Sequence, residues 1–324
     1  MAATEGVVTL DADRPAGFDR AVVFAADGAY LRHAAFAAAQ LAALSPGRTF
    51  DICLCGPEMP PAVAGLAPLG LRRCRVGTAG MFDGLGLDPR RSAASYLRYA
   101  LPDAFAGAYR RLLYLDADVF IQGGDFGALL EVDLGPHPLG AVRDNMQWRT
   151  PRRRTPSFAR LGLPWASVFN SGMLLIDVAA WREREVLGRM LAFGAAHDPA
   201  RIGLDQDLVN AVVRGAFAEL SPVWNWQYTW ASRLFEALDD AHVVHFIGPR
   251  KPWSHDGGEL PLRFRRAYRA FFAEHFPEAP VGPDGVRPLA NRGFVRRMLV
   301  KHLLSQGKLA DYLDRFPDDM TVLV

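Results

Sequence analysis

Short apolar runs separated by chain-breaking residues open the ordered part of the chain. Residues 21–26 (AVVFAA) form a continuous apolar run that ends at Asp27 and Gly28. Residues 34–44 are rich in Ala and Leu, which favours a helix, and they stop at Ser45-Pro46-Gly47. Residues 49–55 form a second strand-like run. This order predicts a β-α-β unit in which both strands are buried on two faces of a parallel sheet.

The same patterns continue along the chain and predict an α/β fold. Helical periodicity places apolar residues on one face over 179–197, and it returns over 261–276 and 291–308. Further buried strands are predicted at residues 111–115, 119–121, 172–176 and 242–247.

Three regions follow from this reading of the chain. Residues 1–20 read as a loose polar leader, and residues 21–278 hold the predicted sheet and its helices. A Pro/Gly-rich stretch at 277–288 then separates a helical, basic C-terminal extension, residues 279–324.

Composition narrows the class of protein. The chain has 324 residues, of which 50% are hydrophobic, and a formal net charge of only +2. These values support a large core and give no sign of a nucleic-acid binder. Its three cysteines argue against a disulfide framework. No signal peptide and no apolar run long enough to span a membrane is evident, so we expect a cytoplasmic protein.

Two carboxylates follow the strand at 111–115 directly. Asp116 and Asp118 are two residues apart, so they face the same side if the backbone stays extended. They lie at the edge where open α/β sheets bind ligands, and hard divalent cations prefer such oxygen ligands. The alternative is a strand end whose aspartates cap a turn. Asp-x-Asp also occurs at 11/13 and 205/207, but neither pair follows a buried strand directly.

A histidine in a late strand supports the metal interpretation. His245 lies in an apolar run that ends at Gly248-Pro249, and Lys251 follows. Two carboxylates and an imidazole suit Mn²⁺. A glycine allows close approach to a phosphate, and the lysine supplies a point charge for it. The alternatives are a hydrogen-bonded core histidine and an ordinary surface lysine.

At this point a set of ordered blocks resembles a known family. The blocks are residues 23–27 (VFAAD), 95–98 (SYLR), 113–118 (LYLDAD), 169–172 (FNSG), 204–207 (LDQD) and 245–253 (HFIGPRKPW). Together they resemble glycosyltransferase family 8, the retaining enzymes that include bacterial lipopolysaccharide galactosyl- and glucosyltransferases and glycogenin. The resemblance implies a GT-A type fold, which is a Rossmann-like, mostly parallel sheet flanked by helices.

The resemblance also implies a reaction and its participants. It implies a hexosyltransferase that moves glucose or galactose from a UDP-sugar to a glycan or glycolipid acceptor, as in lipopolysaccharide biosynthesis. Mn²⁺ would be the cofactor, with Mg²⁺ as an alternative. Two rival functions stay open. One is a sugar nucleotidyltransferase, although those enzymes usually carry a Gly-rich basic loop where this chain has residues 27–32. The other is a non-catalytic relative that binds carbohydrate or a partner protein.

Roles for single residues are likewise implied by the matching positions. Asp116, Asp118 and His245 would hold the metal. The donor would contact Ala25, Asp27, Arg98, Asn170, Gly248 and Lys251. Asp205 and Gln206 would face the reacting side of the sugar, and Asp207 is a further candidate to stabilise it. Asp144 aligns with another acidic residue near the donor sugar or the acceptor. The family often has a polar residue where this chain has Ala29, so one base or ribose contact is expected to differ.

Retention of anomeric configuration admits two mechanisms. One is double displacement through a covalent intermediate, and the other is attack on the face that the phosphate leaves. Because glutamine is a poor nucleophile, Gln206 favours same-face attack.

Two basic segments have open interpretations. Arg149, Arg152, Arg153 and Arg154 form either a solvated loop or a contact for a phosphorylated or acidic acceptor. The helix predicted at 291–308 is basic and amphipathic. It either packs on the catalytic domain or lies on the inner face of an anionic membrane.

Overall fold

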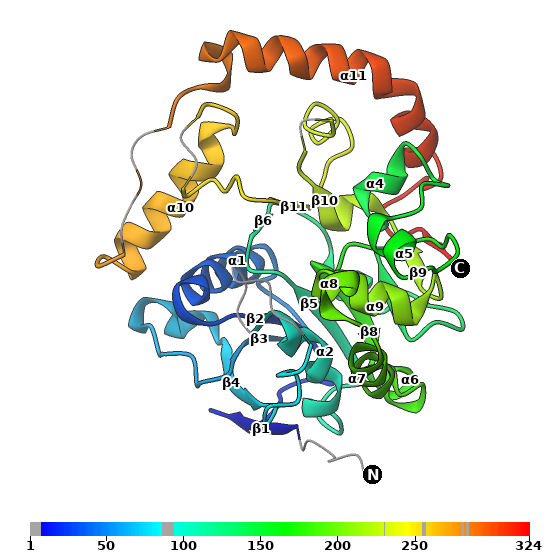
Figure 1. The fold of residues 1–324 in the computed structure, drawn as a ribbon. Coiled ribbons are helices and arrows are strands. Elements are labelled where there is room, and N and C mark those ends of the chain that lie inside the picture. Colours follow the sequence, from blue (N-terminus) through cyan, green and yellow to red (C-terminus); the bar gives the residue numbers. More distant parts are fainter. Residues whose placement is uncertain (1–7, 86–93, 230, 255–256, 280–281, 283–284) are drawn as a thin grey trace.

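A computed structural model describes residues 8–85, 94–229, 231–254, 257–279, 282 and 285–324 (Figure 1). A nine-stranded sheet runs through its centre in the order β1-β4-β3-β2-β5-β8-β7-β9-β12, and a three-stranded sheet has the order β10-β11-β6. The strands of the large sheet are β1 (Thr9–Ala12), β2 (Arg20–Ala25), β3 (Asp51–Gly56), β4 (Arg72–Gly77), β5 (Arg111–Leu115), β7 (Leu139–Ala141), β8 (Met173–Asp177), β9 (Ala218–Leu220) and β12 (Val322–Leu323). Those of the small sheet are β6 (Val119–Ile121), β10 (Trp226–Gln227) and β11 (Val243–His245).

Helices pack on both faces of the large sheet (Figure 1). They are α1 (Leu31–Leu44), α2 (Ala94–Ala104), α3 (Phe126–Leu129), α4 (Asn145–Trp148), α5 (Pro156–Arg160), α6 (Val178–Glu183), α7 (Val186–Ala196), α8 (Pro199–Ile202), α9 (Asp205–Val213), α10 (Leu262–His275) and α11 (Arg292–Leu313). Short 3-10 turns lie at Gly28–Tyr30, Ala64–Leu69, Pro222–Asn225 and Pro288–Ala290. No helix within the described residues is long and apolar enough to cross a membrane.

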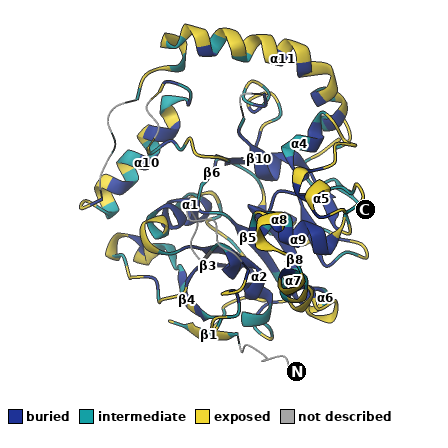
Figure 2. Cartoon of the chain, viewed as in Figure 1, coloured by how far each residue is buried: buried dark blue, intermediate teal, exposed yellow. Residues whose placement is uncertain are grey.

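The alternation of side chains along β2 divides the core into two layers, because successive residues of a strand point to opposite faces. Val23 packs in the layer that α2, α7 and α9 cover, whereas Phe24 packs in the layer that α1 covers. A third, aromatic cluster lies between α1, α10 and the small sheet and includes Phe36, Val244 and Tyr268. In Figure 2 the central strands and the inward faces of the helices are accordingly buried, whereas edge strand β1 is partly exposed.

The expected α/β fold is confirmed, and the structure adds detail to the strand directions. The block β4-β3-β2-β5 is parallel, as the opening β-α-β pattern predicts. The pairings of β5 with β8 and of β8 with β7 are antiparallel. Parallel order therefore holds from β4 to β5, and the rest of the sheet is mixed, since β1 pairs antiparallel with β4 and β7 pairs parallel with β9.

Three elements differ from the sequence-based expectation. The leader is not loose where it is described, because β1 pairs antiparallel with β4, while residues 1–7 lie outside the described part. The single helix expected at 179–197 is split into α6 and α7 at Glu185, whose φ of 50° is left-handed. The C-terminal segment 279–324 returns to the large sheet, where β12 pairs with β9.

A buried cluster of charges attaches this C-terminal segment. Glu219 on β9 accepts hydrogen bonds from Arg143 and from Tyr312 on α11, and Arg315 also pairs with it. Because a buried carboxylate is tolerated only when it is paired, these contacts fix the end of α11 to the sheet.

The chain passes from the large sheet to the small one at the predicted metal motif. β5 ends at Leu115, residues 116–118 follow, and β6 begins at Val119 in the small sheet. β11 pairs with β6 so that His245 lies opposite Val119. Pairing of these strands therefore places a histidine from far along the chain beside Asp118.

Candidate metal and donor site

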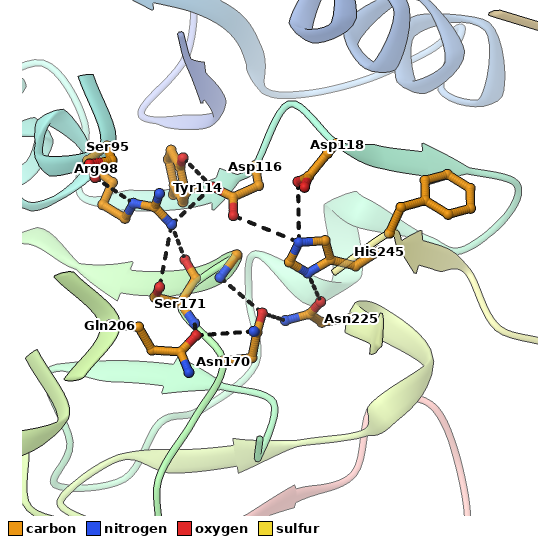
Figure 3. Close-up of polar contacts among 12 residues, drawn as sticks. Ser95, Arg98, Tyr114, Asp116, Asp118, Asn170, Ser171, Gln206, Asn225 and His245 are labelled. Carbon is orange, nitrogen blue, oxygen red and sulfur yellow. Dashed lines mark hydrogen bonds and ion pairs between the residues drawn. The ribbon is translucent and has the colours of Figure 1, made fainter. Parts of the chain in front are cut away.

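Asp116, Asp118 and His245 converge where the two sheets meet (Figure 3). His245 Nε2 lies 3.2 Å from Asp118 Oδ1 and 3.8 Å from Asp116 Oδ2. One ligand atom from each residue lies within 4.8 Å of the others. Two carboxylates and one imidazole at this spacing match the donor set that Mn²⁺ accepts, and Mg²⁺ would use mainly the oxygens.

Lys251 adds a fixed positive charge beside this group. Its Nζ contacts both the Asp118 carboxylate and the backbone oxygen of Phe246. Burial opposes ionisation of Asp118, but the charges of Lys251 and His245 outweigh it and hold the pKa of the carboxyl well below its usual range. Asp118 is therefore a carboxylate, the form that a metal requires.

Gly172 makes room for the three candidate metal ligands because it has no side chain. A Cβ atom on Gly172 would lie 2.2 Å from His245 Cε1 and 2.9 Å from Asp116 Oδ2, well inside contact distance. The backbone oxygen of Gly172 also accepts a hydrogen bond from Asp116 N, at 2.8 Å. The residue after Ser171 must therefore be glycine for the three ligands to converge, and the residues present fit a divalent cation.

Arg98 on α2 balances the charge of Asp116. Its Nη1 donates to Asp116 Oδ1 and to the Ser171 backbone oxygen, both at 2.9 Å. Tyr114 donates to the same Asp116 oxygen at 2.6 Å. Burial disfavours the Arg98 cation, but the Asp116 carboxylate outweighs it and raises the guanidinium pKa. Arg98 therefore holds Asp116 in place from the side opposite His245 (Figure 3).

A chain of side-chain amides runs from His245 to Asp144. His245 Nδ1 donates to Asn225 Oδ1 at 2.9 Å, and Asn225 Nδ2 donates to Asn170 Oδ1 at 3.0 Å. Asn170 Nδ2 donates to Gln206 Oε1 at 3.0 Å (Figure 3). Gln206 Nε2 in turn donates to Asp144 Oδ2 at 2.9 Å.

Every hydrogen bond in this series of side chains runs from a donor on the His245 side to an acceptor on the Asp144 side. The series therefore determines which atom donates and which accepts at His245 and at Asp144. His245 Nδ1 therefore carries a proton, which leaves Nε2 as the ring nitrogen that faces the carboxylates and would bind a cation. At the other end Asp144 accepts, and burial raises the pKa of its carboxyl.

Most of the remaining predicted site residues line the same edge of the sheet. Ala25 and Asp27 lie at the end of β2, next to β5, and Gly248 follows β11 with a φ of 79° that suits glycine. Asp205 is buried on the far side of Arg98 and accepts from Tyr99 at 3.2 Å. Asp207 differs, because its carboxylate accepts from Leu204 N at 3.1 Å and caps α9.

Sequence reasoning missed Asn225 and the steric role of Gly172. Asn225 lies between two tryptophans in the sequence and is fully buried in the 3-10 turn before β10. In the sequence, only its position as a polar residue within an apolar run could have indicated a role in the site. Gly172 was part of a recognised block, but nothing in the sequence shows which side chains approach it.

The geometry agrees with a family assignment. A model of glycosyl transferase family 8 matches residues 21–257. The chain belongs to glycosyltransferase family 8. The site residues from Ala25 to Lys251 all lie inside the matched region.

Two curated proteins are similar to this chain at moderate identity. General stress protein A of Bacillus subtilis is 28% identical over 176 residues, which cover 50% of this chain and 59% of that protein. Lipopolysaccharide 1,3-galactosyltransferase of Salmonella typhimurium is 29% identical over 180 residues, which cover 52% of this chain and 51% of that enzyme. The match thus spans about half to three-fifths of these relatives' lengths.

Solved structures show the same GT-A type fold. The galactosyltransferase LgtC, in complex with donor and acceptor sugar analogs, aligns with a TM-score of 0.62 at 22% identity, covering 79% of this chain and 96% of LgtC. The glycosyltransferase GlyE of Streptococcus pneumoniae aligns with a TM-score of 0.52 at 19% identity, covering 83% of this chain and 66% of GlyE.

We expect Gly172→Ala to separate the metal ligands of this family 8 chain. The new methyl group must displace His245 or Asp116, so Mn²⁺ affinity measured by calorimetry should fall at least about tenfold. Gly188→Ala is the matched control, since Gly188 is on α7 with nothing within 4 Å of an added Cβ. Equal Mn²⁺ affinity in the native chain and Gly172→Ala would contradict the ligand set.

Removal of the Asn225 amide should weaken the metal site without touching a ligand. Asn225→Ala leaves His245 Nδ1 without its acceptor, and loss of such a partner typically costs about 10–100-fold in metal affinity. Asn225→Asp keeps an acceptor oxygen and should restore most of the Mn²⁺ affinity. Equal losses in both variants, with unchanged melting temperatures, would show that Asn225 does not orient His245.

Proposed function

We propose that this protein transfers a hexose, glucose or galactose, from a UDP-sugar to a glycan or glycolipid acceptor of lipopolysaccharide type, with retention of anomeric configuration. The observation that carries the proposal is the convergence of Asp116, Asp118 and His245 next to Lys251 and the Asn170–Gln206 pair. A metal set alone would suit many enzymes. Its position beside buried amides, in a family 8 chain, favours a sugar diphosphate.

The proposed donor site uses the residues along this edge. Asp116, Asp118 and His245 would hold Mn²⁺, with Mg²⁺ as the alternative, and the bound cation would supply Lewis-acid stabilisation of the leaving diphosphate. Lys251 and the glycine turn at Gly248 bind the phosphates. Ala25 and Asp27 contact the base and ribose. Arg98 belongs to the donor site, and Asn170 contacts the donor sugar.

The surroundings of Gln206 support attack on the face that the phosphate leaves. Its amide oxygen accepts from Asn170 Nδ2 and Ser171 N, so the side chain is held in one orientation. Its neighbours are engaged as well, since Asp205 is held by Tyr99 and Asp207 caps α9. A rigid amide suits stabilisation of a cation-like sugar rather than bond formation. Detection of a glycosyl ester on Asp205 or Asp207 would contradict this mechanism.

We expect slow donor hydrolysis in the absence of acceptor. Purified protein with Mn²⁺ would be offered UDP-, GDP-, ADP- and CMP-sugars, and free nucleotide would be measured. One UDP-hexose should be hydrolysed, and Asp118→Ala or a chelator should reduce the rate at least about 100-fold, because the leaving charge is no longer stabilised.

The same chain offers a matched control for Asp118. Asp11 belongs to another Asp-x-Asp sequence, but it lies on edge strand β1 in an exposed pair with Arg75. Asp11→Ala should hydrolyse the donor at the native rate. Turnover of Asp118→Ala at that rate would refute the metal role. Binding of UDP and Mn²⁺ without turnover of any donor sugar, even with acceptor glycans present, would favour the non-catalytic alternative.

We also infer that α11 lies on an anionic membrane surface while it packs on the catalytic domain. Its inner side buries Phe294, Leu309 and Tyr312. Figure 2 shows the outer side of α11 facing away from the rest of the protein. This outer side exposes four apolar residues in adjacent turns: Leu299, Val300, Leu303 and Leu304. Basic residues flank them at Arg292, Arg296, Arg297, Lys301 and Lys308. Apolar residues flanked by cations suit the boundary of an anionic bilayer.

Binding to vesicles tests this inference. The full chain should co-sediment with vesicles that contain phosphatidylglycerol and far less with pure phosphatidylcholine. Leu304 is 81% exposed, so Leu304→Glu should spare the fold and reduce binding at least about tenfold. Gln306→Glu adds the same charge to the same helix without removing apolar surface and should reduce it less. Equal binding by the native chain and Leu304→Glu would refute insertion.

A further inference from the structure

The small sheet that carries His245 has very short strands. β10 spans two residues, and β6 and β11 span three each. Strands of this length form few hydrogen bonds and are marginally stable by themselves. A metal ligand, however, has to be held within about 0.5 Å of its productive position. Contacts from outside the small sheet are therefore needed to fix the position of His245.

One such support acts on the turn that precedes β10. This 3-10 turn, Pro222–Asn225, ends at Asn225, which accepts the hydrogen bond from His245 Nδ1. The indole of Trp224 in the same turn is fully buried, and its Nε1 donates to the backbone oxygen of Asp319 at 2.7 Å. The turn that orients His245 is thus attached to a residue 95 positions further along the chain.

The start of β11 is attached to the same residue. His242 directly precedes β11, and its Nε2 donates to the carboxylate of Asp319 at 3.0 Å. The backbone N–H of His242 also donates to Val223 O at 2.9 Å, which joins β11 to the turn. Asp319 therefore bridges the segments that hold Asn225 and His245, one through its backbone oxygen and the other through its side chain.

Close packing limits the movement of the two rings that Asp319 binds. The ring centroids of Trp224 and His242 lie 4.7 Å apart. A Cβ atom on Gly124 would lie 2.6 Å from the Trp224 ring and 2.9 Å from the His242 ring. The backbone at Gly124, whose φ of 97° favours glycine, thus lies directly against both rings. Asp319 in turn accepts a hydrogen bond from the polar atom of each ring, so little freedom remains to either.

The segment around Asp319 is itself fixed to the large sheet on both sides. Before it, Arg315 pairs with Glu219 on β9 at 3.1 Å. After it, Val322 of β12 pairs with Leu220 of β9. In Figure 1 the chain accordingly ends beside β9. A residue that is anchored before and after itself can impose its position on the groups that it binds.

We propose that Asp319 is a positioning residue for the metal site, which makes the C-terminal segment 314–323 part of the catalytic unit. The region that matches family 8 ends before this segment, so the support comes from outside the matched region. Asp319 would act on His245 indirectly, through Trp224 and His242. The inference rests on the proposed function, because it takes His245 to be a metal ligand.

Calorimetry with Mn²⁺ on the full chain tests this role. Asp319→Ala leaves His242 Nε2 without its acceptor, and the Mn²⁺ affinity should fall at least about threefold, less than for a direct partner of a ligand. Asp319→Asn keeps an acceptor oxygen and should stay within about twofold of the native affinity. Asp311→Ala is the matched control, because it removes an exposed carboxylate from α11 shortly before the segment, and it should bind Mn²⁺ as the native chain does.

A double-mutant cycle separates positioning from a general loss of stability. His242→Phe keeps a ring against Trp224 but removes the group that donates to Asp319. If the Asp319 carboxylate acts through His242, then Asp319→Ala should lower the Mn²⁺ affinity no further in the His242→Phe background. A merely structural contact would lower the melting temperature of each variant and leave the Mn²⁺ affinity of the folded protein unchanged. Independent, additive losses of Mn²⁺ affinity from the two substitutions would overturn the proposal.

The outcomes also distinguish this inference from the proposed function. If Asp118→Ala abolishes Mn²⁺ binding but Asp319→Ala binds Mn²⁺ as tightly as the native chain, only the positioning role is refuted. If the native chain binds no Mn²⁺, the metal site of the proposed function is refuted, and the role of Asp319 with it.

Discussion

The charge balance around Asp116 and Asp118 governs the architecture of this site. Two carboxylates that face one point at the end of a strand repel each other, and each needs a compensating partner. Arg98 balances Asp116 from α2, whereas His245 and Lys251 balance Asp118 from β11 and the turn after it. These partners come from opposite sides of the junction between the two sheets. The site therefore forms only if the small sheet docks on the large one, which makes the ligand geometry a property of the whole domain.

The series of hydrogen-bonded amides extends this dependence to Asp144. Each amide in the series from His245 to Asp144 donates at one end and accepts at the other, so no member can rotate without breaking two bonds. Backbone groups add to this rigidity, since Gly172 N donates to Asn170 and Ser171 N donates to Gln206. Buried networks of this kind are stable only when every member is satisfied. The metal ligand, the donor-side amides and Asp144 are thereby held in one fixed relation.

Much of the fold and the ligand set could be predicted because their signals are local. Buried strands such as residues 111–115 read as continuous apolar runs, and Asp116 and Asp118 follow one directly. The metal assignment of His245 needed the family resemblance, because no local pattern shows that β11 pairs with β6. Glu185 illustrates a different limit. It sits within a helical pattern, yet the left-handed turn there depends on how α6 and α7 pack, which periodicity does not record.

The net charge of +2 conceals a separation of charge on which the proposed reaction depends. The carboxylates of the metal site are half-buried, beside buried or half-buried cations that balance them. By contrast, the arginines of the loop at 149–154 and the basic residues of α11 are largely exposed. A buried pair resists screening by salt, whereas exposed cations act over about 10 Å at 0.1 M ionic strength and weaken as salt rises. Donor binding should thus depend on the divalent ion and only weakly on ionic strength. Binding of α11 to an anionic lipid surface should weaken steeply with added salt, so salt can separate donor binding from membrane binding.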